Sequence, residues 1–435
     1  MRVFRRATLA VNGFLEGVVA MRVCVLGAGV VGLTSAYQLA RDGHDVTILE
    51  GRDGAALEAS FANGGQLSYS YVAPLADPSV LPHLPAWLLQ GDSALRFVPR
   101  LDPRQWRWCL SFLLACRGGR ARQTAVEMLR LGALSREALH ELVQRESIDF
   151  NYVRNGKLVV YRDANAFDAA RRKMDFLQAA GSEQRALDAA ACVALEPALE
   201  HARPLLAGGI HTPSEEAGDC HRFSVALAGV LNTRYGVAIR YETPVHSFVT
   251  ERGAALAVRT PRGEIRADAF VVALGNGSAP LLRALGMRLP MYPLTGYSLT
   301  IPVAPGHAPR VSVTDLHRKV VYAPLGERLR IAGMVEIAGM DVTRRDRRLD
   351  LLKRQAQEIF PAAGNYAAAQ TWCGHRPATP DSKPLIGPTR YRNLWLNTGH
   401  GALGFTLACG SARLIADAIA GRAPPLEPGA YAWPR

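Results

Sequence analysis

The sequence predicts an α/β protein, α+β overall, with a Rossmann-like nucleotide-binding domain and a second, largely antiparallel-sheet domain. The first observation is a strand, a glycine-rich turn, a helix and another strand within residues 22–50, which together form a βαβ unit. The second is a series of strand-like runs between residues 297 and 334 with no helical pattern among them. The third is that nucleotide-type elements recur at both ends of the chain and in its middle.

The βαβ unit begins with RVCVLG at 22–27, a buried-strand pattern. Residues 30–42 (VVGLTSAYQLARD) have apolar side chains at helical spacing, and Gly43 is suited to end that helix. DVTILE at 45–50 is the second buried strand. Such a unit prefers parallel strands and a right-handed crossover.

The remaining elements are less regular. Residues 76–115 are first proline-rich and then tryptophan-rich. We expect helices at 124–145, 165–180, 222–235 and 344–359, and a further helix after Gly404. Strands are expected at 157–161, 237–241, 270–275, 297–303, 311–314, 319–324, 329–334 and 393–397, with a β-hairpin at 254–266.

This order implies that the chain passes between two domains more than once. We predict a discontinuous nucleotide-binding domain and a discontinuous substrate (cap) domain. The first comprises residues 21–80, 215–285 and 385–425, and the second comprises 81–214 and 286–384. Residues 1–20 are read as an extension or unstructured segment, because Met21 opens directly on a strand, and 426–435 as a tail.

Size and charge limit the function classes. A chain of 435 residues can hold two domains with good cores. The formal charge of +13 allows a polyanion partner, but its arginine clusters at 117–122 and 344–348 lack interleaved aromatic residues. A solvated basic surface is therefore favoured, and no nucleic-acid partner is expected.

The seven cysteines are odd in number and include no CxxC pair, so neither a metal site nor a disulfide framework is indicated. A reducing cytoplasm fits this usage best. There is no stretch of about 18 consecutive apolar residues, so no membrane-spanning helix is expected.

Residues 27–32 (GAGVVG) supply the pattern G-x-G-x-x-G at Gly27, Gly29 and Gly32, between a strand and a helix. These glycines allow a tight turn, a close approach of pyrophosphate and close helix–strand packing. Glu50 ends the second strand, where a carboxylate can accept both hydrogens of a ribose diol and would repel a 2′-phosphate. The alternative for Glu50 is a surface acid at a strand end.

A second glycine-rich loop, NTGHGALGFTLACG at 397–410, follows the last strand and opens an apolar helix. A helix N-terminus provides N–H donors and partial positive charge, which would stabilise negative charge on the pyrimidine side of a reduced flavin. The strand at 270–275 (FVVALG) also ends in glycine. Two glycine loops, one for phosphates and one for a ring, favour FAD over NAD.

Longer stretches carry a resemblance. They are RVCVLGAGVVGLTSAYQLARDGHDVTILE, EASFANGGQLS (58–68), EEAGDC (215–220), YPLTGYSLTIP (292–302), GHRPATPDSKPLIG (374–387) and NLWLNTGHGALGFTLACGS (393–411). From Met21 to about residue 421 the chain resembles the D-amino acid dehydrogenase (small subunit) family, within the D-amino acid oxidase, glycine oxidase and sarcosine oxidase group of flavoproteins. The resemblance implies FAD-dependent oxidative deamination of D-alanine-like D-amino acids to 2-oxo acids and ammonia. Hydride would pass from Cα to flavin N5, and electrons would pass to a respiratory acceptor such as a quinone rather than to oxygen.

For the chemistry, the main expectation is a clamp for the substrate carboxylate. Arg376 lies in GHRPATPD, a loop that Pro377 and Pro380 would stiffen, and related oxidases place their carboxylate-binding arginine in the matching motif. A structural pairing of Arg376 with Asp381 is the alternative. Tyr297 and Tyr322 are expected to line the pocket with a hydroxyl or an aromatic wall, or else to pack within a sheet.

Further residues are expected to contact FAD. The polar loop after Glu50 would pass the pyrophosphate and the flavin edge, or else form a surface Ω-loop. His400 would bond a flavin carbonyl or cap a turn. The full expected set is Gly27, Ala28, Gly29, Val30, Val31, Gly32, Glu50, Gly51, Arg52, Ser60, Asn63, Gly64, Gly65, Gln66, Val245, Gly275, Gly399, His400, Gly401, Leu403, Gly404 and Thr406.

Some positions depart from the family pattern. His375 stands where the family tends to have an apolar residue, and the pair His221–Arg222 also differs, so both could reshape the side-chain pocket. Cys373 stands roughly where some sarcosine oxidases attach flavin covalently, but its surroundings match poorly. A free or packed thiol is the favoured reading of Cys373.

The stretch 86–115 combines Trp87, Trp106 and Trp108 with leucines and flanking arginines. This composition suits an interfacial helix on the inner face of the cytoplasmic membrane, where a quinone would be reached, and equally a helix packed on the core. Two other functions stay open: an oxygen-using oxidase of sarcosine, glycine or D-proline analogues, and a non-catalytic flavoprotein subunit.

Overall fold

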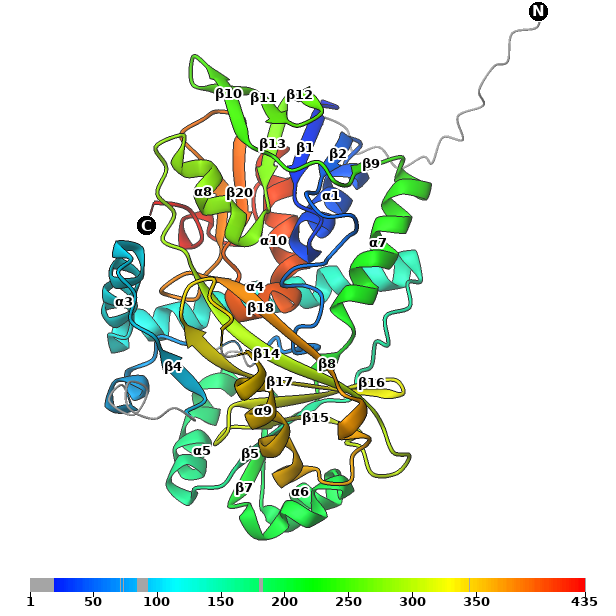
Figure 1. The fold of residues 1–435 in the computed structure, drawn as a ribbon, viewed down its shortest axis with the longest axis vertical. Coiled ribbons are helices and arrows are strands. Elements are labelled where there is room, and N and C mark those ends of the chain that lie inside the picture. Colours follow the sequence, from blue (N-terminus) through cyan, green and yellow to red (C-terminus); the bar gives the residue numbers. More distant parts are fainter. Residues whose placement is uncertain are drawn as a thin grey trace, which may run out of the picture.

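The computed structural model describes residues 19–70, 72, 74–83, 93–179, 183–343 and 345–434. The predicted extension, apart from its last two residues, and Trp87 therefore lie outside the described residues. The two largest sheets lie one above the other in Figure 1, with helices packed around each. The chain crosses between the two sheets several times.

The upper sheet is the nucleotide-binding type. Its strand order is β19-β20-β13-β1-β2-β9, and all neighbours are parallel except β19 and β20. The strands are β1 (Arg22–Leu26), β2 (Asp45–Leu49), β9 (Ala238–Arg240), β13 (Ala269–Val272), β19 (Leu385–Pro388) and β20 (Leu394–Thr398). They come from the three segments that the sequence assigned to one domain.

Four helices form the main core with this sheet: α1 (Val30–Arg41), α4 (Gly118–Glu146), α7 (Cys220–Tyr235) and α10 (Gly404–Ile419). The long helix α4 packs against α10, although its residues fall within the segment 81–214 that we assigned to the substrate domain. The apolar side chains of α4 decide this placement, because Met128, Leu131 and Leu139 are buried in the same cluster as α1.

Helix α10, with the short turn η5 (Gly401–Leu403) before it, is the one segment of the described chain long and apolar enough to cross a membrane. Most of it is buried inside the molecule, between α1 and α4. Its hydrophobicity is thus explained by core packing.

A small sheet covers the other side of the upper sheet (Figure 1), together with α8 (Ser278–Arg283) and η3 (Gly275–Gly277). It consists of β10 (Ser247–Glu251), β11 (Ala254–Thr260) and β12 (Gly263–Arg266), all antiparallel. The sequence indicated the β11–β12 hairpin but not β10.

The lower sheet has nine strands in the order β18-β14-β17-β16-β15-β5-β7-β6, with β4 paired to β17. Only the β15–β5 and β17–β4 pairs are parallel. Its strands are β4 (Leu95–Phe97), β5 (Lys157–Tyr161), β6 (Arg185–Leu187), β7 (Gly208–Thr212), β14 (Tyr292–Pro302), β15 (Ser312–Asp315), β16 (Val320–Leu325), β17 (Arg328–Ile337) and β18 (Gln370–Ala378). The predicted fold class, with one parallel and one largely antiparallel sheet, is confirmed.

Shorter elements complete the fold. A two-stranded pair joins β3 (Gln66–Leu67) to β8 (Glu216–Ala217) between the two sheets. Around the lower sheet lie α3 (Pro103–Ala115), α5 (Ala164–Ala179), α6 (Ala189–Leu195), α9 (Arg345–Ile359), η1 (Pro78–His83), η2 (Pro197–Leu205) and η4 (Tyr366–Ala368). The C-terminal segment, which we read as a tail, contains η6 (Pro428–Ala430) and packs on β19, because the carbonyl of buried Tyr431 accepts from the Ile386 N–H.

The position of Arg376 differs from the prediction. The sequence placed it in a loop stiffened by prolines, whereas the structure places it in β18, opposite Leu294 of β14. β18 is the edge strand of its sheet, and an edge strand tolerates the missing N–H of Pro377. The start of β14 was also missed, five residues before Tyr297.

Candidate active site

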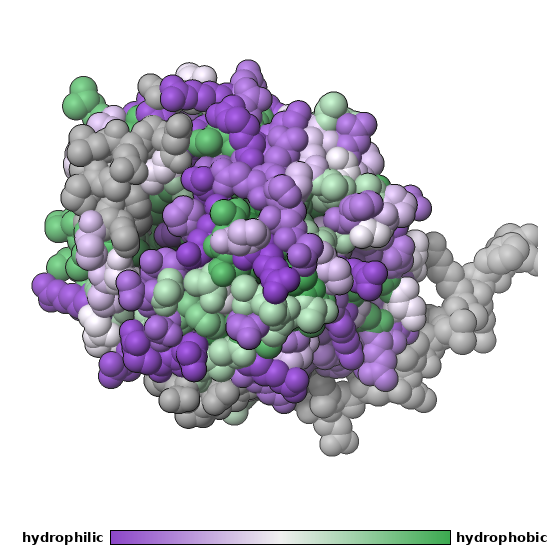
Figure 2. Space-filling model, turned by 90° about the horizontal axis from the view of Figure 1, so that it is seen from below, coloured by the Kyte–Doolittle hydropathy of each residue, from purple (hydrophilic) through white to green (hydrophobic). Residues whose placement is uncertain are grey.

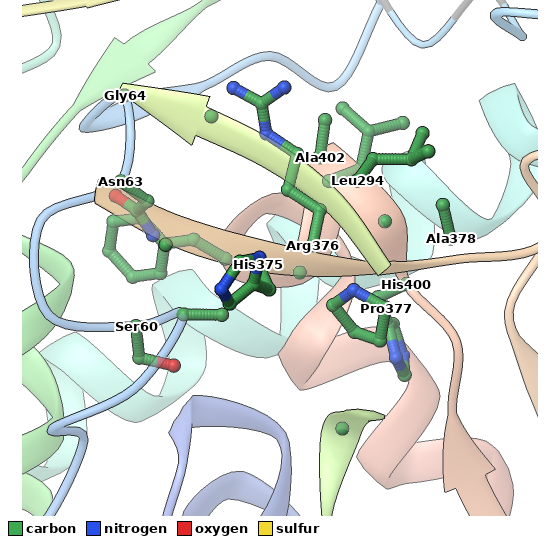
Figure 3. A pocket seen from close by; sticks show the side chains of 18 of the residues that line it. Ser60, Asn63, Gly64, Leu294, His375, Arg376, Pro377, Ala378, His400 and Ala402 are labelled. Atoms are coloured by element: carbon green, nitrogen blue, oxygen red, sulfur yellow. The ribbon is translucent and has the colours of Figure 1, made fainter. Parts of the chain in front are cut away.

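A cavity of about 700 Å³ lies between the two sheets and is lined from both. Figure 3 shows part of it, with the loop of Ser60 and Asn63 on one side and strands β14 and β18 crossing above. Most of the residues that the sequence singled out line this one cavity. They are Gly27, Gly29, Val30, Val31, Glu50, Ser60, Asn63, Gly64, Gly65, Gln66, Gly275, Tyr297, Arg376, Gly399, His400, Gly401, Leu403, Gly404 and Thr406.

The first glycine loop joins β1 to α1, and each of its glycines meets a different constraint. A Cβ on Gly27, whose φ is +105°, would lie 2.7 Å from the Ala273 carbonyl oxygen. A Cβ on Gly32 would lie 1.9 Å from the Gly27 oxygen, so this residue lets the helix pack on the turn. At Gly29 the nearest atom is Ser60 Oγ at 3.6 Å, and its open side faces the cavity. The loop therefore leaves space for a phosphate group at the N-terminus of α1.

Glu50 follows β2 and is half-buried at the cavity wall. Its Oε2 accepts a hydrogen bond from the Ala28 N–H at 2.7 Å, and its Oε1 accepts from the Arg52 N–H at 2.9 Å. These bonds fix the carboxylate, and each oxygen keeps a further lone pair for a ribose hydroxyl.

The second glycine loop leads from β20 into α10, with positive φ at Gly399 (+80°) and Gly401 (+55°). No side chain caps the N-terminus of α10, and no acidic residue lies in its first turn. Leu403, Gly404 and Thr406 of this end line the cavity. The uncapped N–H groups are thus free of protein side-chain acceptors and suit an electron-rich ring edge.

Arg376 lies deep in the cavity, where its Nη1 donates to the Met334 carbonyl oxygen at 3.2 Å. Figure 3 shows its side chain rising from β18 across β14 beside Leu294, apart from Pro377 and His400. No carboxylate of the described residues pairs with it, and Asp381 instead accepts from the Lys383 N–H. Loss of hydration lowers the pKa of Arg376 to about 10. A guanidinium group in such a place is suited to an anionic ligand.

The side chains of the two tyrosines, Tyr297 and Tyr322, belong to one core cluster between the lower sheet and α9. Tyr297 is among the residues that line the cavity, but its side chain packs in that cluster and its hydroxyl donates to Glu336 Oε2 at 2.8 Å, so the expected pocket hydroxyl is not free. Tyr322 does not line the cavity, which corrects our expectation. It packs edge-on against Phe360 on the opposite face of the lower sheet, beneath α9.

His400 is buried beside the second glycine loop, and its Nε2 lies 3.1 Å from Ser411 Oγ. Burial without a charged partner lowers its pKa to about 3, so the ring is neutral at physiological pH. The histidine thus ties the loop to the body of α10.

Five residues expected near the cofactor do not line the cavity: Ala28, Gly32, Gly51, Arg52 and Val245. Ala28 and Gly32 shape the first loop from behind through backbone contacts. Val245 packs partly buried in the cluster beneath the small sheet. Arg52 pairs with Glu58 and lines a smaller neighbouring pocket of about 280 Å³.

The structure also shows where the residues that depart from the family pattern lie. Cys373 lines the smaller pocket and not the main cavity, as a free thiol. His221 contacts Phe61, and Arg222 pairs with Asp149, so neither reaches the cavity. His375 does line the cavity, on the side of the Ser60–Asn63 loop (Figure 3).

Sequence reasoning missed two groups of lining residues. One is an apolar wall near Arg376, made of Leu75, Leu95, Trp108, Phe112, Leu294 and Met334. The other is Lys157 of β5, five strand positions from β18 in the lower sheet, with Ser68 beside it. A usable signal existed for Lys157, because it is the single charge in the otherwise apolar strand KLVVY.

The comparisons with known proteins agree with this geometry. The family model FAD dependent oxidoreductase (DAO) matches residues 22–418. D-amino acid dehydrogenase 2 of Pseudomonas aeruginosa is 52% identical over 408 residues, covering 93% of this chain and 96% of its own length. D-amino acid dehydrogenase 2 of Ralstonia nicotianae is 47% identical over 425 residues, covering 95% and 100%. The solved glycine oxidase of Geobacillus kaustophilus superposes with a TM-score of 0.74 at 21% identity, covering 96% and 99%.

The cavity fits the cofactor of this family. Its two glycine-lined helix N-termini and the fixed carboxylate of Glu50 provide what a dinucleotide with a ring at its far end requires. The predicted cofactor, FAD, and the stated resemblance are both confirmed. The chain belongs to the DAO family of FAD-dependent oxidoreductases.

Proposed function

We propose that this protein oxidises D-amino acids to 2-oxo acids and ammonia, and passes the electrons to an acceptor other than oxygen. The relatives named D-amino acid dehydrogenase, at 41–52% identity over nearly the whole chain, support the substrate class and its chirality. The observation that carries the proposal is Arg376, a guanidinium group in the cofactor cavity that no carboxylate of the described residues neutralises.

Arg376 would bind the substrate carboxylate through two parallel hydrogen bonds. That contact fixes one end of the amino acid, and the cavity wall fixes the rest, so that Cα is oriented for hydride loss. FAD, when bound, supplies the two-electron acceptor for that hydride. We assign no side-chain base, because a neutral substrate amine can support the departing hydride without one.

The wall beside Arg376 indicates which side chains the substrate carries. Leu294 is its cross-strand neighbour, and Leu95 lies on β4 next to Val335. Trp108 is held in place by its Nε1, which donates to the Ala378 carbonyl oxygen at 2.9 Å. These groups favour apolar side chains and offer no partner to a charged one.

The test is a panel of D- and L-amino acids with an artificial dye acceptor, on the wild type and on Arg376→Met. We expect oxidation of D-isomers by the wild type and a loss of kcat/KM of about 10²- to 10³-fold in the variant, as when one side of a buried charge pair is removed. Arg162→Met is the matched control. Arg162 is also largely buried but pairs with Asp315 and Glu358, so its loss should affect stability and leave KM for D-alanine unchanged.

Each rival function has its own outcome. Stoichiometric hydrogen peroxide on turnover in air would indicate an oxygen-using oxidase. Unchanged flavin absorbance after anaerobic mixing with the whole panel would indicate a non-catalytic subunit. Full activity of Arg376→Met would remove Arg376 from the mechanism.

We also propose that the protein lies in the cytoplasm and contacts the membrane through α3, so that a membrane quinone is the acceptor. Trp106, Leu110, Leu113 and Leu114 form an exposed apolar strip on this helix. Exposed arginines lie on the helix and just after it in the sequence: Arg104, Arg107, Arg117, Arg120 and Arg122. Such a pattern suits an anionic lipid surface. In Figure 2 hydrophobic residues reach the surface at the left edge, the side on which α3 lies in Figure 1.

A further inference from the structure

Two cationic side chains, Arg376 and Lys157, line the cavity from well-separated strands of the lower sheet. Arg376 is on edge strand β18, and Lys157 is the first residue of β5, with β14, β17, β16 and β15 between them. Five strand spacings therefore separate the two strands, which is roughly 24 Å at the usual spacing. The two cations therefore cannot bind the same carboxylate, and the function proposed above uses only Arg376.

Lys157 is connected to the N-terminus of α10. Its Nζ donates to Ser68 Oγ at 2.9 Å, and the Ser68 N–H donates to Thr406 Oγ1 at 3.2 Å. Thr406 lies in the first turn of α10, and all three residues line the cavity. The ammonium group thus lies two hydrogen bonds from the helix end that the sequence assigned to the flavin ring.

The carboxyl group of Glu215 acts electrostatically on Lys157, and its Oε1 accepts a hydrogen bond from the Ser70 N–H at 2.7 Å. The strand partners of Lys157 are the uncharged Ser312 of β15 and Thr212 of β7. Burial lowers the pKa of Lys157 to about 8 and raises the pKa of Glu215. Lys157 is therefore mainly protonated at neutral pH.

We propose that the ammonium group of Lys157, together with the N-terminus of α10, stabilises the negative charge that the bound flavin gains on reduction. Lys157 would thereby raise the reduction potential of the flavin. This inference rests on the proposed position of the ring at α10. Hydride transfer adds two electrons and one proton, so the ring gains one negative charge unless a second proton follows. A fixed cation in a low-dielectric site stabilises that charge far more than water would.

The experiment measures the reduction potential of the FAD-loaded protein by anaerobic equilibration with a reference dye, with no amino acid present. In Lys157→Met we expect the equilibrium constant for reduction at pH 7 to fall at least tenfold, which is about 30 mV for a two-electron couple. Lys383→Met is the matched control. Lys383 is also a buried lysine, paired with Glu127 at 2.7 Å, but it does not line the cavity, so its loss should leave the potential unchanged.

A second measurement, the pH dependence of the reduction potential, uses the wild type alone. It tests the proposal even if Lys157→Met does not retain FAD. Above pH 8 Lys157 is neutral in the oxidised protein and takes up a proton on reduction. The potential should therefore fall more steeply with pH above 8 than below it. A potential unchanged in Lys157→Met, or a wild-type slope that does not change near pH 8, would overturn the proposal. Because no substrate is used, these results do not depend on whether D-amino acids are oxidised.

Discussion

Gly296 of β14 lies directly beneath the guanidinium group of Arg376: a Cβ on Gly296 would be 2.6 Å from Nη2 and 2.7 Å from Cζ. The cross-strand partner of Gly296 is Gly374, whose missing side chain instead leaves room for the ring of Trp372, so Gly296 is the residue that opens the space for Arg376. The position of the Arg376 guanidinium group, the proposed carboxylate clamp, therefore depends on Gly296. This glycine is two residues along β14 from Leu294, the cross-strand partner of Arg376.

Gly296→Ala tests this relationship. The guanidinium is the flexible end of a long side chain, so it should move aside and the protein should fold normally. A displacement of about 1 Å in a substrate-positioning group can lower the rate about 10²-fold. We expect kcat/KM for D-alanine to fall 10- to 100-fold, with the melting temperature and FAD content close to wild type.

Gly229→Ala is the control, because a Cβ on this exposed residue of α7 meets nothing within 4 Å. It should keep full activity and gain up to about 1 kcal/mol in stability from the better helix propensity of alanine. If Gly296→Ala also keeps full activity, the position of Arg376 is not limiting for substrate binding.

The buried His400 should make the stability of the folded protein sensitive to acid. Its pKa is lowered to about 3 in the folded protein, so below the unfolded value of about 6.5 the unfolded chain binds the extra proton. Stability from this group is therefore complete above about pH 6.5 and is lost as the pH falls toward 3. The loss amounts to about 2 kcal/mol at pH 5.

The acid sensitivity can be checked by measuring the melting temperatures of the wild type and His400→Gln from pH 7 to pH 5, with FAD in excess. The difference in melting temperature between the wild type and His400→Gln should shrink as the pH falls. His246→Gln, at an exposed position, serves as the control and should follow the wild type at every pH. Parallel curves for the wild type and His400→Gln would contradict the assignment.

The parts of the fold that were predicted correctly are those with local signals. The turn at Gly27–Gly32, the helix after it and β2 follow one another within 30 residues, and each step has a residue pattern of its own. The same holds for β20, the loop at Gly399 and α10. FAD could be predicted because both helix N-termini are visible as glycine loops after buried strands.

The parts that could not be predicted depend on contacts between distant segments. Arg376 appeared to lie in a loop, because its prolines suggest a break, and only the pairing with β14 shows that β18 is an edge strand. The burial of Lys157 follows from Ser68 and Glu215, which are far from it in sequence. Tyr297 and Tyr322 were expected to line the pocket, and only the sheet register shows that both side chains pack in the cluster under α9. Which predicted residues contact FAD stays a prediction.

The last prediction concerns the exposed strip of α3. Trp106 and Leu110 have relative exposures of 52% and 61%, whereas Trp108 and Phe112, on the opposite side of the same helix, are buried. Burying two leucines in a lipid interface contributes about 1.5–3 kcal/mol each, and nearby arginines add about 1 kcal/mol each with anionic lipid. We expect the protein to sediment with phosphatidylglycerol vesicles and much less with phosphatidylcholine vesicles, and we expect added salt to release it.

The double variant Leu110→Glu, Leu113→Glu should lower vesicle binding at least tenfold and leave turnover with an artificial dye unchanged, because both side chains point away from the cavity wall. Val225→Glu is the matched control: Val225 has a relative exposure of 49% on α7, outside the strip, so vesicle binding should persist. If the double variant binds vesicles as tightly as the wild type, α3 is not the contact. If the wild type binds neither kind of vesicle, the strip serves another purpose. Reduction of a membrane quinone should fall in parallel with vesicle binding, since the proposal ties acceptor access to this face of the molecule.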